Sequence, residues 1–285
     1  MATCDLREKV LGRLEDLPTL PFVMEKLLQV VGKGDYSMLE IANIISRDQA
    51  ISSKVLRVAN SAYYGFSKQI GDVKQAVVLL GANEVCNIAL SVSVFDFFHA
   101  RHSLPIDAVS FWEYNLGVAV GSVVIGRKVG FTPVRVLYLS GLLHDVGKAV
   151  LNFFLPEHYI NVVQLCSCGD REVDVERRAL GIDHCEVGGI VGEMWNFPRH
   201  IVNAMRYHCE PGVAPEDSEL VSIIHLTECI VCALGIGGKQ TGFALDVQDF
   251  AWKVLSKSAS DFRDIGDEIH REFLDAISVF SDVMS

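Results

Sequence analysis

The sequence predicts an all-α protein, and three observations carry this prediction. Apolar residues recur three and four positions apart in almost every segment, which is the spacing of one face of an α-helix. Proline, glycine and small polar residues stand at the intervals where helices begin and end. No segment alternates apolar and polar residues as a strand would, because β-branched runs such as Val123-Val124-Ile125 lie inside longer helical periods.

The composition is that of a folded protein with an excess of acidic residues. Of the 285 residues, 50% are hydrophobic and 21% are charged, which is enough apolar material for a large core in one domain or two. The net charge of −11, without a basic stripe, argues against direct binding to nucleic acid. No uninterrupted apolar run reaches the ~20 residues of a membrane span, and residues 1–15 lack a signal-peptide pattern, so we expect a cytoplasmic protein with no membrane partner.

Residues 1–100 are predicted to form an N-terminal helical subdomain. Pro21 is a suitable first residue for one helix, and Asp72 is a suitable cap for another. Ser37, with Glu40 three residues later, has the pattern of a capping box. The expected helices cover residues 11–17, 21–31, 38–46, 51–60, 73–80 and 85–98.

Residues 101–285 are predicted to form a second helical subdomain, which packs with the first into one compact unit. The boundary is placed in the stretch 99–105, where Pro105 interrupts the helical pattern. One long helix is expected to begin after Pro133 and to run through residue 154. The other expected helices cover residues 110–129, 156–168, 171–180, 184–195, 198–208, 219–234, 250–255 and 262–280.

Two adjacent ionisable residues, His144 and Asp145, interrupt the apolar pattern of that long helix. Burying both side chains costs several kcal/mol unless they are paired, hydrogen-bonded or bound to a metal. Lys148 follows one helical turn after His144 and is expected on the same side. The segment Gly141-Leu142-Leu143-His144-Asp145-Val146-Gly147-Lys148 is therefore the first candidate for a functional site.

Three further polar residues, His184, His208 and Glu228, stand on or at the ends of other predicted helices. Helices that each contribute an inward histidine or carboxylate build metal sites in the cores of helical bundles. Imidazole and carboxylate ligands, without an obvious set of thiolates, indicate one divalent ion such as iron, manganese or zinc, with a preference for the harder metals.

A structural role is the alternative for each of these residues taken singly. A histidine on an apolar helix, such as His184, His208 or His225, usually forms a hydrogen bond in the core, and Lys148 could extend its amine to solvent. The eight cysteines are expected to be reduced, and the pairs Cys166/Cys168 and Cys229/Cys232 do not have the spacing of a zinc ribbon.

Residues 141–148 resemble the motif of the HD phosphohydrolase superfamily, and further blocks resemble the HDOD family, an HD-related output domain of bacterial signalling proteins. The resemblance implies a multi-helix HD-domain-like bundle with an N-terminal helical subdomain. It covers about residues 17–234. The blocks are residues 17–21, 44–48, 54–65, 75–81, 180–188, 195–198 and 207–211.

The chain departs from the ligand pattern of catalytic HD proteins at three positions. Tyr114 stands where the first histidine ligand is expected, Cys209 stands where a second adjacent histidine is common, and Glu228 replaces the last aspartate. The resemblance therefore implies a single metal ion, and a dinuclear site is not expected. Its implied ligands are His144, Asp145, His184, His208 and Glu228.

Two functions of different classes are consistent with these residues. The resemblance implies a regulatory signalling module, non-catalytic or weakly catalytic, that binds a partner protein or a small ligand. Residues 60–65, with Tyr63 and Tyr64, form either a helix stop that covers the core or a recognition loop. The alternative is a metal-dependent phosphohydrolase in which Lys148 steadies the phosphate of the substrate.

Overall fold

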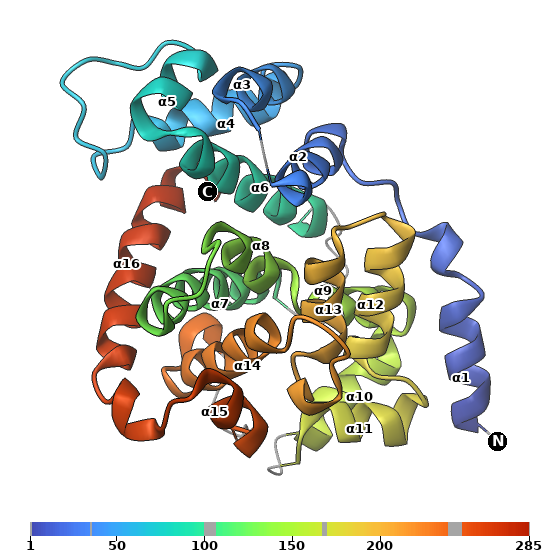
Figure 1. Ribbon diagram of the computed structural model, residues 1–285. Helices are drawn as coiled ribbons and strands as arrows, with labels where there is room; N and C mark the ends of the chain where they lie inside the picture. The colour runs from blue at the N-terminus through green and yellow to red at the C-terminus, as the bar shows by residue number, and fades with distance from the viewer. Residues whose placement is uncertain (1, 35, 100–106, 167–169, 239–246, 285) are drawn as a thin grey trace.

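The computed structural model describes residues 2–34, 36–99, 107–166, 170–238 and 247–284, and these residues form helices joined by turns and by one long loop, residues 60–72, between the fourth and fifth helices (Figure 1). The described part of the chain contains no strand, so the predicted all-α class is confirmed. The predicted boundary at residues 99–105 falls almost entirely outside the described residues, and the division into subdomains stays a prediction.

The first part of the chain forms a group of helices whose caps follow the sequence closely. Ser37 accepts a hydrogen bond from the backbone N–H of Glu40 at 3.1 Å, and Asp72 accepts one from Gln75 at 2.8 Å. The predicted opening helix is wrong, because the 3-10 turn Leu14–Asp16 replaces it after an earlier helix. The helices are α1 (Ala2–Leu11), α2 (Phe22–Lys33), α3 (Met38–Ile45), α4 (Gln49–Ala59), α5 (Val73–Leu80) and α6 (Ala82–His99).

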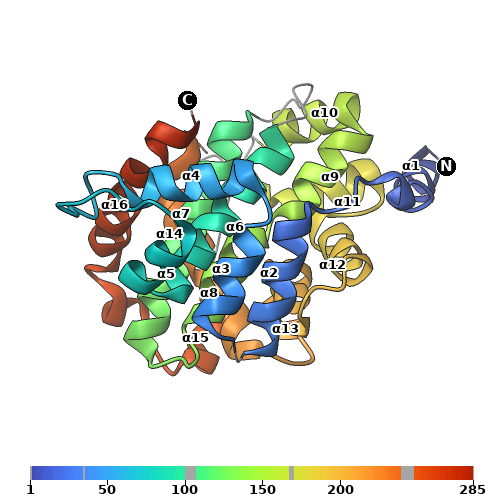
Figure 2. The same ribbon diagram turned by 90° about the horizontal axis from the view of Figure 1, so that it is seen from above.

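The rest of the chain forms a larger bundle in which α7 is central. This helix packs against α8, α14 and α16, and Figures 1 and 2 show α16 running along one side of the molecule. The helices are α7 (Ala108–Val129), α8 (Arg135–Leu143), α9 (Val146–Phe154), α10 (Pro156–Cys166), α11 (Glu172–Leu180), α12 (His184–Met194), α13 (Arg199–Tyr207), α14 (Ser218–Ala233), α15 (Asp249–Leu255) and α16 (Ile265–Met284).

One described helix, α7, is long and apolar enough to cross a membrane by length and composition alone. In its most apolar window, 61% of the residues are buried inside the protein. This burial is the pattern of a central core helix.

The long helix expected through residue 154 is in fact two helices. α8 ends at Leu143 and α9 begins at Val146, so His144 and Asp145 form the junction between them. The backbone N–H of Lys148 donates to the carbonyl oxygen of Asp145 at 2.9 Å, which tightens the first turn of α9. The two ionisable side chains therefore lie between helix ends, and His144 and Lys148 do not share a helix.

The packing of α9 against α12 depends on a glycine. A Cβ atom on Gly147 would lie 1.9 Å from the carbonyl oxygen of His184, which is far inside van der Waals contact. The absence of a side chain at Gly147 thus lets the backbone of α9 touch the start of α12. This close approach brings the His144–Asp145 junction next to His184.

Candidate functional site

The five predicted metal ligands lie together in one buried cluster. His144 and Asp145 come from the α8–α9 junction, His184 from the first turn of α12, His208 from the end of α13 and Glu228 from α14. None of these residues is exposed by more than 2%. Four distant segments of sequence therefore meet at one point.

Asp145 is at the centre of the cluster. Its Oδ1 lies 3.6 Å from Nε2 of His184 and 3.5 Å from Nε2 of His208, and its Oδ2 lies 3.6 Å from Nε2 of His144. Glu228 closes the opposite side, with carboxylate oxygens 4.0 Å from Nε2 of both His144 and His208. Ligand atoms of His144, Asp145, His208 and Glu228 all lie within 4.8 Å of one another.

The outer nitrogen of each histidine is held by an acceptor. Nδ1 of His144 lies 2.7 Å from the carbonyl oxygen of Gly141, and Nδ1 of His208 lies 3.1 Å from that of Ala204. A carbonyl oxygen can only accept, so Nδ1 donates and Nε2 is left to face the centre. Nδ1 of His184 is held in the same way by Glu176 Oε2 at 2.6 Å. This is the arrangement that orients histidines for metal binding.

Two buried atoms at the centre test whether a cation would fit. His144 Nε2 and Glu228 Oε2 have no hydrogen-bond partner among the described residues. A buried polar atom left without a hydrogen bond costs about 1–3 kcal/mol. Both residues belong to the set whose ligand atoms lie within 4.8 Å of one another, and a divalent cation held by that set would satisfy them. The residues therefore fit a metal.

Burial also sets the protonation of His144. Burial lowers the pKa of His144 to about 4, although Asp145 acts in the opposite direction. The imidazole of His144 is thus neutral near pH 7, which is the form that binds a metal ion.

The side chain of Lys148 is buried and does not extend to solvent. It is 2% exposed, and its Nζ lies 2.7 Å from Asp145 Oδ2 and 3.0 Å from Glu172 Oε2. Burial acts to lower the pKa of Lys148, but Asp145, Glu172 and Glu228 outweigh it and hold the pKa well above its usual value. The amine is therefore a buried cation that neutralises the carboxylates, and the alternative of an amine extended to solvent is wrong.

Tyr114 reaches the cluster from α7. Its hydroxyl donates a hydrogen bond to Glu228 Oε1 at 3.3 Å, and its ring centre lies 6.1 Å from that of His144. The residue at the position of the missing first ligand thus contacts the centre through a phenol.

Sequence comparison gives the family of this chain. A model described as HDOD domain matches residues 17–211. The chain belongs to the HDOD domain family. This match confirms the resemblance drawn from the motifs, and the helical architecture agrees with it.

Two solved structures share the fold of this HDOD chain, and one further protein is similar to it in sequence. A crystal structure of an HDOD domain protein of unknown function from Geobacter sulfurreducens has a TM-score of 0.80 at 24% identity, over 100% of this chain and 98% of that one. A Marinobacter aquaeolei structure, provisionally named as a signal transduction protein, has a TM-score of 0.76 at 18% identity, over 99% and 67%. An uncharacterised Treponema pallidum (strain Nichols) protein is 24% identical over 75% of this chain. The chain spans less than half the length of that relative, 42%.

Two cysteines belong to the centre of this HDOD chain, contrary to the expectation that no set of thiolates is present. Cys185 Sγ lies 3.7 Å from Nε2 of His208, and Cys209 Sγ lies 3.6 Å from Nε2 of His184. The available signal was the repeated His-Cys dipeptide, because each of these cysteines directly follows a candidate ligand.

Other candidates have structural roles or lie elsewhere. His225 uses both ring nitrogens, at 2.8 Å from the carbonyl oxygen of His208 and 3.1 Å from the backbone N–H of Gln248, as expected of a core histidine. Cys229 and Cys232 are buried in α14, and Cys168 of the other pair lies outside the described residues. Sequence reasoning missed Glu172 and Glu176, which support the centre through Lys148 and His184.

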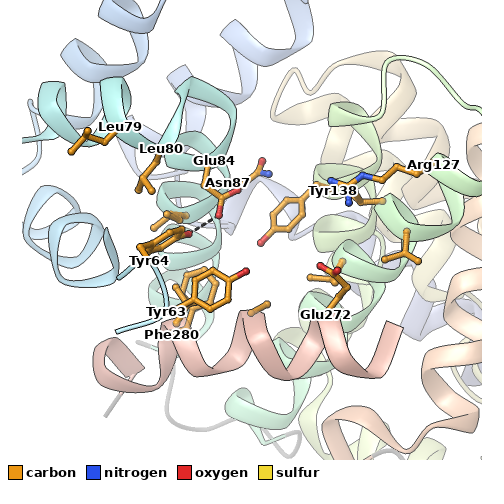
Figure 3. Close-up of a pocket in the computed structure, with 16 residues that line it drawn as sticks. Tyr63, Tyr64, Leu79, Leu80, Glu84, Asn87, Arg127, Tyr138, Glu272 and Phe280 are labelled. Carbon is orange, nitrogen blue, oxygen red and sulfur yellow. Dashed lines mark hydrogen bonds between the residues drawn. The ribbon is translucent and has the colours of Figure 1, made fainter. Parts of the chain in front are cut away.

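A second candidate site is a pocket of about 550 Å³ that the recognition-loop hypothesis anticipates in part (Figure 3). The loop residues Tyr63 and Tyr64 line one wall, and residues of α5, α6, α7, α8 and α16 line the rest. The Tyr64 hydroxyl donates to Glu84 Oε1 at 2.6 Å. The wall also includes Arg127 and Tyr138, so aromatic faces and charged groups point into one space.

Proposed function

We propose that this HDOD chain is a regulatory module of bacterial signalling in the cytoplasm, which binds a partner protein or a small ligand and has little or no catalytic activity. One observation carries the proposal. The candidate metal ligands and Lys148 are each at most 2% exposed, so a phosphoester has no direct contact with any of them. Hydrolysis at a metal centre requires an open coordination position for water or substrate.

The positions of two side chains support this view. Lys148, the residue proposed to steady a phosphate, has its amine within 3.0 Å of both Asp145 and Glu172. Tyr114 places a hydroxyl on Glu228 where a catalytic relative would have another ligand. An incoming phosphate would have to displace buried ionic contacts worth several kcal/mol.

A metal ion in this centre fits a structural role. His144, Asp145, His184, His208 and Glu228 are the residues that would hold one divalent ion, iron, manganese or zinc. When bound, such an ion would supply Lewis acidity. Because its ligands come from α12, α13, α14 and the α8–α9 junction, binding would stabilise the folded state by tying these segments together.

The pocket behind the Tyr63–Tyr64 loop is the proposed binding site for a ligand or partner. Its aromatic walls with a few charged groups have the character of small-molecule sites. Tyr63 and Phe66 are 51% and 39% exposed, so the loop also presents aromatic surface to a protein. α16 packs on both α4 and α7, and a bound molecule would therefore touch both parts of the fold.

The second candidate function is a metal-dependent phosphohydrolase of the HD superfamily, with Lys148 contacting the substrate phosphate. The observation in its favour is the set of histidines whose Nε2 atoms converge on Asp145. This function would require the centre to open.

A turnover assay separates the two functions. The purified chain is loaded with Mn²⁺, Fe²⁺ or Zn²⁺ and given a panel of nucleotides and cyclic dinucleotides. The regulatory function predicts product formation no faster than in Asp145→Ala. Metal-dependent turnover that disappears in Asp145→Ala but persists in the surface variant Lys33→Ala would overturn the proposal.

A further inference from the structure

The buried centre contains a second set of metal ligands that overlaps the first. His184, Cys185, His208 and Cys209 offer two nitrogen and two sulfur atoms, all within 4.8 Å of one another. Both cysteines are free of disulfide bonds. We infer that these four residues form a tetrahedral zinc site.

Two of the distances between the ligand atoms match those of tetrahedral zinc. Zinc bonds of about 2.0–2.1 Å to nitrogen and 2.3 Å to sulfur place two nitrogens about 3.3–3.4 Å apart, and a nitrogen and a sulfur about 3.5–3.6 Å apart. The two histidine Nε2 atoms are 3.3 Å apart. The nitrogen–sulfur distance is 3.6 Å for His184–Cys209. Cys185 Sγ lies 3.7 Å from Nε2 and 3.8 Å from Nδ1 of His208, so its side chain must rotate toward Nε2 to bind the same ion.

The set that includes the carboxylates fits a metal less well. Bonds of about 2.1 Å to nitrogen and oxygen would place such ligands about 3.0–3.4 Å apart. Glu228 oxygens are 4.0 Å from Nε2 of both His144 and His208, and Asp145 Oδ1 is 3.5 Å from Nε2 of His208. This set must contract around an ion, whereas the sulfur-containing set needs a rotation of the Cys185 side chain.

The hydrogen bonds of the two histidines also turn their Nε2 atoms toward each other. Nδ1 of His208 donates to the Ala204 carbonyl oxygen, and Nδ1 of His184 is held by Glu176 Oε2 at 2.6 Å. In the neutral rings, two Nε2 lone pairs therefore face each other at 3.3 Å. Zinc would accept both lone pairs. Glu176 is itself fixed by the Tyr159 hydroxyl at 2.9 Å, so His184 has the carboxylate support typical of zinc-bound histidines.

A zinc ion with four protein ligands has no position left for water or substrate. The zinc site rests on the proposed function in one respect, that a cation occupies this centre. A zinc ion with all four positions filled would also explain why the proposed regulatory module does not hydrolyse phosphoesters.

The direct test is X-ray absorption at the zinc edge on the purified full chain, with metal content measured in parallel. We expect one zinc per chain, with two sulfurs at about 2.3 Å and two nitrogens at about 2.0–2.1 Å. A zinc spectrum with only nitrogen and oxygen neighbours, or a chain that binds no zinc, overturns the inference. This measurement needs no variant, so it does not depend on whether a variant folds.

Cobalt substitution identifies the sulfur ligands individually. The wild-type chain with Co²⁺ should show sulfur-to-cobalt charge-transfer absorption, and Cys185→Ser/Cys209→Ser should lose it. Zinc affinity should fall about 100-fold or more in this double variant, since losing even a supporting group costs about 10–100-fold. Cys86→Ala, at a buried cysteine in α6, and Glu228→Gln should keep the absorption. A spectrum unchanged in the double variant overturns the inference, whereas metal-dependent turnover would overturn the proposed function and leave the spectrum as expected.

Discussion

Lys148 and Asp145 form a fully buried ion pair, with Nζ 2.7 Å from Oδ2 inside the first turn of α9. The same amine lies 3.0 Å from Glu172 and 4.0 Å from Glu228. One lysine therefore compensates three carboxylates, of which Asp145 and Glu228 are buried and Glu172 is partly exposed. This arrangement links the stability of the fold to the chemistry of the centre.

The first prediction concerns removal of that charge. Lys148→Met should lower the free energy of unfolding by about 3–5 kcal/mol, because it leaves buried carboxylates without their cation. Urea unfolding of the metal-free chain measures the change. The exposed lysine Lys33 gives the control, and Lys33→Met should change stability by no more than about 0.5 kcal/mol. A loss below about 1 kcal/mol in Lys148→Met would contradict the buried ion pair.

The second prediction concerns the contact between α9 and α12. Gly147→Ala should destabilise the protein by about 3 kcal/mol or more, because the new Cβ would lie 1.9 Å from the His184 carbonyl oxygen. Gly188→Ala is a matched control on the facing helix, where the nearest atoms to a new Cβ are at 3.6 Å. The measurement is the thermal unfolding temperature of each variant. If Gly147→Ala and Gly188→Ala were equally stable, the two helices would not be in backbone contact.

The third prediction concerns the pocket loop. Tyr64→Phe removes the hydrogen bond to Glu84 and should cost about 1 kcal/mol, with faster amide hydrogen exchange in residues 60–66. Tyr63→Phe, one residue earlier in the same loop, is the control. Unchanged exchange in Tyr64→Phe would mean that this bond does not hold the loop against α6.

The fourth prediction concerns pH. Burial lowers the pKa of His200, although Asp217 acts in the opposite direction. The unfolded chain, with a histidine pKa of about 6.5, then binds a proton more readily than the folded chain. His200 therefore contributes stability above about pH 6.5 that is lost as the pH falls toward its folded-state pKa.

His200→Gln should reduce the loss of stability between pH 7.5 and 5.5, as measured by urea unfolding at each pH. His270→Gln, at an exposed position of α16, should leave the pH dependence as it is in the wild type. If the stability of His200→Gln changed with pH as steeply as that of the wild type, the pH dependence would belong to other groups.

The helix caps could be predicted from the sequence, because each depends on residues only a few positions apart. The caps at Ser37 and Asp72 need only a side-chain oxygen and an N–H three residues later. The break between α8 and α9 was missed, because no proline stands there and the nearby Gly147 reads as a helix-interior residue. It depends on packing against α12, which local propensity does not describe.

The sequence predicted only part of the candidate site, because the rest depends on packing between distant segments. His144 and Asp145 were recognisable as a costly buried pair, and the family motifs pointed to His184, His208 and Glu228. Cys185 and Cys209 were missed because cysteine usually behaves as a small apolar core residue. The sulfurs lie beside His184 and His208 only because the start of α12 packs against the end of α13 in the folded chain.

Single-turnover hydrolysis tests the central claim, a buried centre without catalysis, most directly. The metal-loaded chain, in large excess over bis(p-nitrophenyl) phosphate, would reveal even weak activity through release of p-nitrophenol. The closed geometry of His144, Asp145 and Lys148 predicts the same rate as in His144→Ala and in buffer containing the metal alone. A metal-dependent rate well above both, abolished by His144→Ala, would contradict the account and identify the chain as a phosphohydrolase.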